Sequence, residues 1–166
     1  MRKYYKMILV LMISFFSTAP VISAQEVDMM LFNRDVNGVA VGTLLHRARV
    51  IEKFGEPTSY KEQLSEDNEV SRWYYYGKSY IHTQDDIFDQ FAVRDTNFTA
   101  FTNHISGGLK VGDPLSKLDN FKYGKPIQYR ETEDSVVYRI FNTTDSPVDL
   151  YVKNGFIIDI VYLNPM

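Results

Sequence analysis

Apolar positions recur with a helical period in two short segments of this chain. In Leu44–Phe54 and again in Leu115–Phe121, apolar residues return at spacings of three and four, as on one face of a helix. Each segment is preceded by Val-Gly and followed by Gly-x-Pro, with the glycine at Gly55 or Gly124. Glycine readily adopts the left-handed conformation that ends a helix. The pattern therefore predicts two helices that stop before these glycines, and it indicates a duplicated unit.

Strand-like sequence follows each predicted helix, in short apolar or aromatic runs between polar stretches. The predicted strands are Ser71–Tyr76, Ser79–Thr83, Ile87–Val93, Phe98–Ile105, Ile127–Arg130, Val136–Phe141, Val148–Val152 and Phe156–Tyr162. In the last hairpin, a three-residue loop ending at Gly155 would pair Leu150 with Ile158. That register places apolar residues on one face, so we expect it rather than a two-residue turn.

Alternation along the strands assigns side chains to two faces of the sheet. Trp73, Tyr75, Tyr138, Ile140, Leu150 and Ile158 are predicted to face the helices and to be structural. The other face, called the open face below, would carry large amphipathic rings and a guanidinium, which are typical of protein-binding hot spots. The residues predicted to contact a partner are Tyr74, Tyr76, Arg139, Phe141 and Tyr151. Two alternatives stay open, in which another sheet or the segment 25–37 covers this face.

The first 24 residues explain the distribution of charge. Arg2, Lys3 and Lys6 precede the apolar run Met7–Phe16, and Ala24 offers a small residue for cleavage before Gln25. This is the pattern of a secretory signal peptide, and the apolar run is too short for a membrane anchor. We therefore expect an exported protein, periplasmic or secreted, without stable membrane insertion after cleavage. The remaining chain has 15 basic and 21 acidic residues, which argues against nucleic-acid binding.

Candidate catalytic chemistry is sparse. The chain has no cysteine, and its histidines (His46, His82 and His104) are not at metal-ligand spacing. No nucleophile motif or phosphate loop is present, and no pair of carboxylates stands out among the acids. We expect no catalytic residue, no metal and no cofactor. A hydrolase with an unrecognised carboxylate site remains an alternative from a different class of protein.

The order of Val-Gly, a short helix, Phe/Tyr-Gly-x-Pro, Trp73-x-Tyr75 and a closing Asn-Gly hairpin resembles the small SmpA/OmlA bacterial envelope domain. Two such units in tandem resemble the fold of the beta-lactamase inhibitor protein (BLIP). The resemblance implies an α+β fold, a tandem repeat of short helices packed on one face of a curved antiparallel sheet. The expected division is a signal peptide at 1–24, an N-terminal segment at 25–40, and repeat units at 41–106 and 107–166.

Members of that superfamily act as protein-binding scaffolds or inhibitors, and none is characteristically an enzyme. We therefore predict a non-enzymatic, exported protein-binding module, of the inhibitor kind, whose partner is another protein. A cell-envelope scaffold that binds peptide or outer-membrane components is the first alternative. The second unit departs from the pattern, because Tyr138-x-Ile140 stands where the first has Trp-x-Tyr.

Overall fold

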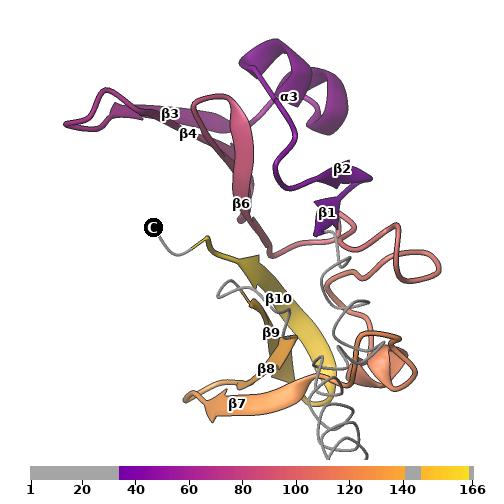
Figure 1. Ribbon diagram of the computed structural model, residues 1–166. Coiled ribbons are helices and arrows are strands. Elements are labelled where there is room, and N and C mark those ends of the chain that lie inside the picture. Colours follow the sequence, from indigo (N-terminus) through magenta and orange to yellow (C-terminus); the bar gives the residue numbers. More distant parts are fainter. Residues whose placement is uncertain (1–33, 141–146, 165–166) are drawn as a thin grey trace, which may run out of the picture.

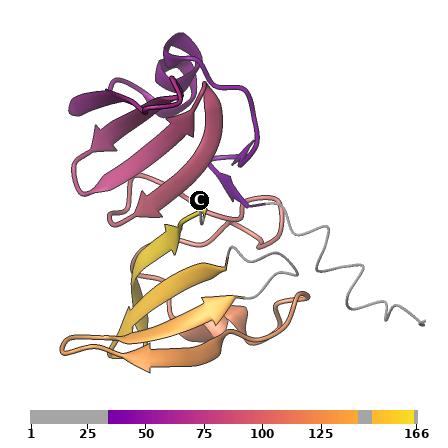
Figure 2. The same cartoon turned by 60° about the vertical axis from the view of Figure 1, so that its left-hand side comes forward.

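A single antiparallel sheet of eight strands dominates the computed structural model, which describes residues 34–140 and 147–164. Its strand order is β3-β4-β5-β6-β10-β9-β8-β7. The strands are β3 (Ser59–Leu64), β4 (Val70–Tyr76), β5 (Ser79–Gln84), β6 (Ile87–Val93), β7 (Ile127–Glu131), β8 (Val136–Ile140), β9 (Val148–Lys153) and β10 (Phe156–Tyr162). Each half of the chain supplies four strands, and the halves meet where β6 pairs with β10 (Figure 2).

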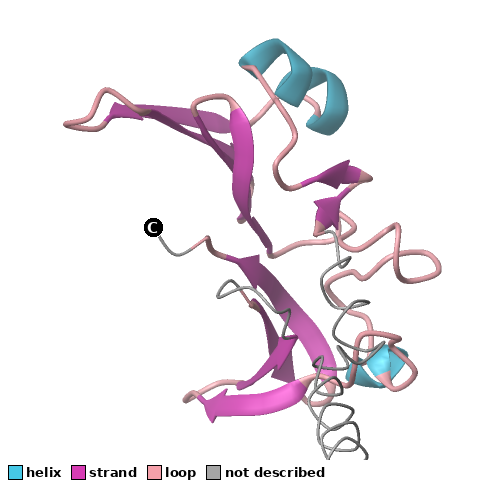
Figure 3. Ribbon diagram, viewed as in Figure 1, coloured by secondary structure: helices cyan, strands magenta, loops and turns pink. Residues whose placement is uncertain are grey.

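The remaining described elements lie on one side of this sheet. They are β1 (Asp35–Val36), β2 (Val39–Ala40), α3 (Arg47–Phe54) and a 3-10 helix (Leu115–Leu118). Figure 1 shows the sheet bending so that both edge strands, β3 and β7, curve away from these elements. Both helices are on the right in Figure 3, behind the convex side. The opposite face, the open face, is therefore concave.

The predicted α+β fold with tandem helices is wrong, because the structure is mostly antiparallel sheet and the described residues contain one α-helix. α3 begins at Arg47 rather than at Leu44, and its N-cap residue is His46. In the second segment only four residues are helical, in the 3-10 conformation. Ser116, Asp119 and Asn120 lower the helix propensity of that segment, whereas Ala, Arg, Glu and Lys make up most of α3.

The backbone entering each helical segment nevertheless makes the same contacts. Gly42 N donates to Phe88 O at 2.7 Å, and Phe88 N donates to Thr43 O at 2.8 Å. In the second half, Gly112 N donates to Ile157 O at 2.8 Å, and Ile157 N donates to Asp113 O at 2.9 Å. The two halves therefore share a local backbone arrangement although their helices differ.

The predicted three-residue loop of the last hairpin is also wrong. Asn154 and Gly155, with φ of 54° and 80°, form a two-residue turn that pairs Lys153 with Phe156. Positive φ at both central residues is the geometry preferred in such hairpins. Ile158 is an extra residue in a β-bulge, after which Ile160 pairs with Leu150. The bulge restores the apolar face that the longer loop was expected to provide, and Ile158 itself is 39% exposed.

Side chains on the convex face form the core in continuous rows across the sheet. One row joins residues that lie directly opposite each other on neighbouring strands: Tyr60, Tyr74, Ile81, Phe91, Tyr162, Val148 and Ile140. All but Tyr60 are buried. The row is closed by Val50 and Phe54 of α3 and by apolar residues of the loops after β6. The core thus depends on the convex face alone for its large side chains.

Candidate functional site

The open face carries a row of residues that crosses all eight strands. It runs through Ser59, Tyr75, Tyr80, Ala92, Val161, Asp149, Arg139 and Ile127. Ala92 and Val161, which lie opposite each other where β6 pairs with β10, form the centre of the row. The small side chains of Ala92 and Val161 thus lie between the larger side chains of Tyr80 and Asp149 on the concave face of the sheet.

Aromatic rings cover the open face in the β3–β6 half. Trp73 lies opposite His82 with ring centroids 4.6 Å apart, and Tyr75 lies opposite Tyr80 at 6.2 Å. The Nζ of Lys61, on the edge strand, lies 5.0 Å from the Trp73 ring centroid. Trp73, Tyr75 and Tyr80 are half-buried. Each ring therefore packs on its neighbours and still presents surface to solvent.

His82 and Asp89 are close together beneath these rings. His82 Nδ1 lies 3.2 Å from Asp89 Oδ2, and Asn164 Nδ2 donates to Asp89 Oδ1 at 2.7 Å. Burial by itself raises the pKa of Asp89, but His82 and Asn164 outweigh burial, and the pKa of Asp89 is lowered overall. Asp89 is the extra residue of the bulge in β6, which is why it faces the same side as Gln90.

Charged groups replace the rings in the β7–β10 half. Arg139 donates to both oxygens of Asp149, at 2.7 and 2.9 Å, and its Cζ lies 3.5 Å from the Tyr129 ring centroid. Hydrogen bonding to Asp149 outweighs burial and raises the pKa of Arg139. A guanidinium held on both sides in this way is fixed in position before any ligand arrives.

A third carboxylate, Asp159, lies between the two halves. Arg94 Nε donates to Asp159 Oδ2 at 3.0 Å. Burial raises the pKa of Asp159 in spite of this cation. The carboxylates of Asp89, Asp149 and Asp159 are thus each in contact with a basic side chain, from His82, Arg139 and Arg94 respectively.

A pocket of about 550 Å³ opens on this face near the β7 edge. Its lining residues come from five strands and from the segments that flank them: Gln90, Arg130, Arg139, Pro147, Asp149, Tyr151, Val161, Leu163 and Asn164. Arg130 Nη2 donates to the Tyr151 hydroxyl at 3.2 Å. The open face therefore combines an aromatic half with a charged half that contains a pocket.

The predicted partner-contact residues fall in three places. Arg139 and Tyr151 are half-buried on the open face and line the pocket. Tyr74 is fully buried and Tyr76 is 7% exposed, both on the core side, so their assignment to the open face is wrong. Phe141 lies outside the described residues.

The inversion in β4 has a clear physical cause. Tyr74 pairs with Ile81, and Tyr76 donates its hydroxyl proton to Gly55 O at 3.1 Å and packs on Phe98. Both faces of this strand are aromatic, so alternation gave no contrast between them. Trp73 and Tyr75, predicted to be structural, are the residues that face the open side. The pairing of Tyr74 with the apolar Ile81 of β5 distinguishes the two faces.

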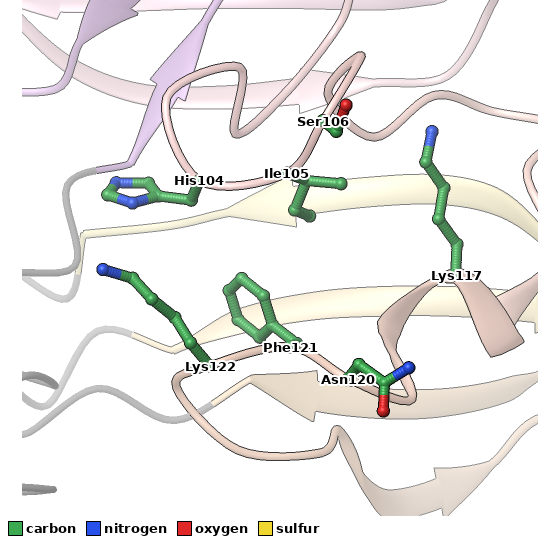
Figure 4. Close-up of a pocket in the computed structure, with 7 residues that line it drawn as sticks. All are labelled: His104, Ile105, Ser106, Lys117, Asn120, Phe121 and Lys122. Atoms are coloured by element: carbon green, nitrogen blue, oxygen red, sulfur yellow. The ribbon is translucent and has the colours of Figure 1, made fainter.

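A second pocket, of about 320 Å³, lies near the convex side, away from the open face. Figure 4 shows Lys117 and Lys122 with Phe121 and Asn120 on one wall, and His104, Ile105 and Ser106 on the other. His104 Nδ1 is 3.1 Å from the Tyr123 hydroxyl. Within residues 34–140 and 147–164, no group of His, Asp or Glu side chains is placed to hold a metal ion. No helix in the described part of the chain is long and apolar enough to cross a membrane.

No protein-family model, no curated protein and no solved structure matches this chain. A function for this protein is therefore inferred from the geometry of the open face.

Proposed function

We propose that this chain is an exported, non-enzymatic module that binds another protein through the open face. The observation that carries the proposal is one concave face with half-buried Trp73, Tyr75 and Tyr80 on β4 and β5 and with Arg139 held in position across β6, β10 and β9 from them. Tryptophan, tyrosine and arginine dominate the energetics of protein interfaces, because they bury large areas and still form polar contacts. The core is completed on the convex side, so these side chains are available for a partner.

The carboxylates of the face pair with basic or amide side chains. A glycoside hydrolase uses one carboxyl group as an acid and a second as a base or nucleophile. Here Asp149 and Asp159 each accept hydrogen bonds from an arginine, and Asp89 accepts one from Asn164. These contacts support a surface whose charges hold side chains in place.

Affinity capture from a native envelope fraction tests the proposal. The wild-type protein is compared with Trp73→Ala and Tyr151→Ala, which remove half-buried rings from the two halves of the face. Leu44→Ala is the matched control, because it removes a 57% exposed apolar side chain near α3. We expect a specific protein to be retained by the wild type and the control and lost from the open-face variants.

The outcome also separates the alternatives. Outer-membrane proteins or envelope peptides among the retained partners would identify a scaffold, and a soluble enzyme would identify an inhibitor. Equal retention by all four proteins, with equal melting temperatures, would contradict binding through the open face. Turnover of glycan or peptide that is abolished by Asp159→Asn would establish a hydrolase instead.

A further inference from the structure

Arg130 differs from the other charged groups that line the pocket on the open face. Arg139 and Asp149 neutralise each other through two hydrogen bonds. Arg130, on the edge strand β7, forms no ion pair with any described carboxylate. Its partners among the described residues are the Tyr151 hydroxyl at 3.2 Å and the neighbouring Tyr129 ring. Counting the described residues, the pocket lining therefore has one positive charge without a counter-charge.

The hydrogen bond between Arg130 and Tyr151 leaves donors free in the pocket. A guanidinium has five N–H groups, and one of them is used here. The Tyr151 oxygen accepts that bond, so its own hydroxyl proton remains available to a further acceptor. Both groups line the same pocket. A carboxylate that enters beside them can accept from Arg130 and Tyr151 together, and a hydrogen bond between a guanidinium and a carboxylate is stronger than one between neutral groups.

Apolar side chains form part of the remaining lining, beside the polar Gln90 and Asn164 and the Arg139–Asp149 pair. Val161 lies at the centre of the face, and Pro147 and Leu163 form further walls. These walls suit the methylene groups that carry a side-chain carboxylate, since they remove apolar surface from water without competing for the charge. The pocket therefore fits an anion on a short aliphatic arm.

We infer that this pocket receives an acidic side chain, glutamate or aspartate, of the partner protein, held by Arg130 and Tyr151. The inference rests on the proposed function and adds the chemistry that one end of the face recognises. The inference also gives the two halves of the open face different binding chemistry. The aromatic half offers rings for stacking, whereas the pocket offers one charged group.

Selection from a library of random short peptides displayed on phage tests the inference. Selected peptides are synthesised, and their affinities are measured for the wild type, Arg130→Gln, Tyr151→Phe and Arg49→Gln. Arg49 is an exposed arginine on α3 and provides the matched control. We expect the selected peptides to share an acidic residue. Arg130→Gln should weaken binding by about tenfold or more, since a hydrogen bond to a charged group contributes roughly that much.

Tyr151→Phe should weaken binding by a smaller factor, and Arg49→Gln should have no effect. Replacing the shared Glu or Asp of the peptide by its amide should reproduce the loss, and that loss should not add to the effect of Arg130→Gln. Because the amide replacement is made in the peptide, its effect on binding to the wild type tests the inference even if a protein variant folds poorly.

Two results would overturn the inference in distinguishable ways. Selected peptides that bind Trp73→Ala more weakly than the wild type, but lack an acidic residue or bind Arg130→Gln as tightly as the wild type, would refute the acidic anchor. The proposed function would be unaffected by that result. A library that yields no peptide sensitive to any open-face variant would count against both.

Discussion

The β3–β6 half and the β7–β10 half of the sheet place different side chains at positions that the strand register makes equivalent. In the first half Trp73 lies opposite His82 and Tyr75 opposite Tyr80. At the corresponding positions of the second half Val137 lies opposite Tyr151 and Arg139 opposite Asp149. Stacked rings in one half are thus replaced by an ion pair and a pocket in the other.

The convex face diverges less, although Ile140 stands where the first half has Tyr76. Each half has a tyrosine facing the core, Tyr74 or Tyr138, and both β6 and β10 begin with a two-residue turn and a bulge. The comparison teaches that two halves with similar turns and backbone contacts can carry different open faces, because the open-face positions do not fill the core.

The largest expected difference between the halves is in the core. Tyr74→Ala should reduce the free energy of unfolding by about 3–5 kcal/mol, because a fully buried ring leaves a cavity. Tyr138→Ala should cost roughly half as much, since its ring is half-buried. Denaturant unfolding measures both, with Tyr151→Ala as an open-face control. Equal losses at all three positions would contradict the assignment of faces.

Glycine substitutions after the helical segments should give a smaller effect that is similar in both halves. Gly55 and Gly124 have φ of 84° and 102°, and a Cβ at either would meet no atom within 4 Å. Gly55→Ala and Gly124→Ala should therefore each cost about 1–3 kcal/mol through backbone strain alone. Thermal unfolding provides the measurement, and Lys125→Ala, at an exposed neighbour, is the control. A large cost at only one glycine would show that the segments end differently.

Alkaline pH should affect the first half through Tyr76, for which the second half has Ile140. Burial raises the pKa of Tyr76 from 10.0 to about 12. The folded protein therefore keeps this proton where the unfolded chain loses it, so the stabilisation is complete below the ordinary tyrosine pKa and is lost as pH rises through about 12. Tyr76→Phe should cost about 1 kcal/mol at neutral pH, by loss of the hydrogen bond to Gly55.

Denaturant midpoints measured across this alkaline range provide the test for Tyr76. The difference between wild type and Tyr76→Phe should shrink as the pH rises. A constant difference would mean that Tyr76 does not couple ionisation to folding.

The smallest expected effect concerns the cross-strand pairs of the open face. Replacing Arg139 and Asp149 together by tyrosines transfers the ring pair of the first half to the second. Each single replacement leaves one charge without its partner, so the double variant should be more stable than the sum of the singles predicts. A coupling energy of about 1 kcal/mol or less is expected, from a four-protein thermodynamic cycle. Additive effects would mean that the pairs are independent of their context.

Strands with clear ends were predictable from the sequence. The predicted bounds of β6 and β10 match the structure, because turn residues and apolar runs delimit both strands. β3 was not predicted, since Ser59–Leu64 is polar and lies at an edge, where no face has to be apolar. Its apolar neighbours on β4 gave no sign of the edge strand beside them.

Segment 98–105 shows the opposite error, an apolar run that is not a strand. Phe98, Ala100 and Phe101 are buried in a loop instead. The loop is held by Asp35, a fully buried carboxylate that accepts hydrogen bonds from the backbone of Thr102, Asn103 and Gly38. A long-range brace of this kind leaves no periodic signal in the sequence. Two residues of the open-face site, Arg139 and Tyr151, were predictable from the sequence, because they lie in strands in which the other face is clearly apolar.

The junction of β6 with β10 has a consequence for the order in which the chain folds. The other strand pairs of the sheet join neighbours in sequence, whereas Val93 must find Ile160. Local hairpins close quickly, and pairing across a long intervening chain is entropically costly and slow. We therefore expect the two halves to collapse first as separate meanders and the central pairing to limit the folding rate. Until it forms, β6 and β10 are unpaired edges, and the nascent protein is most exposed to aggregation at that stage.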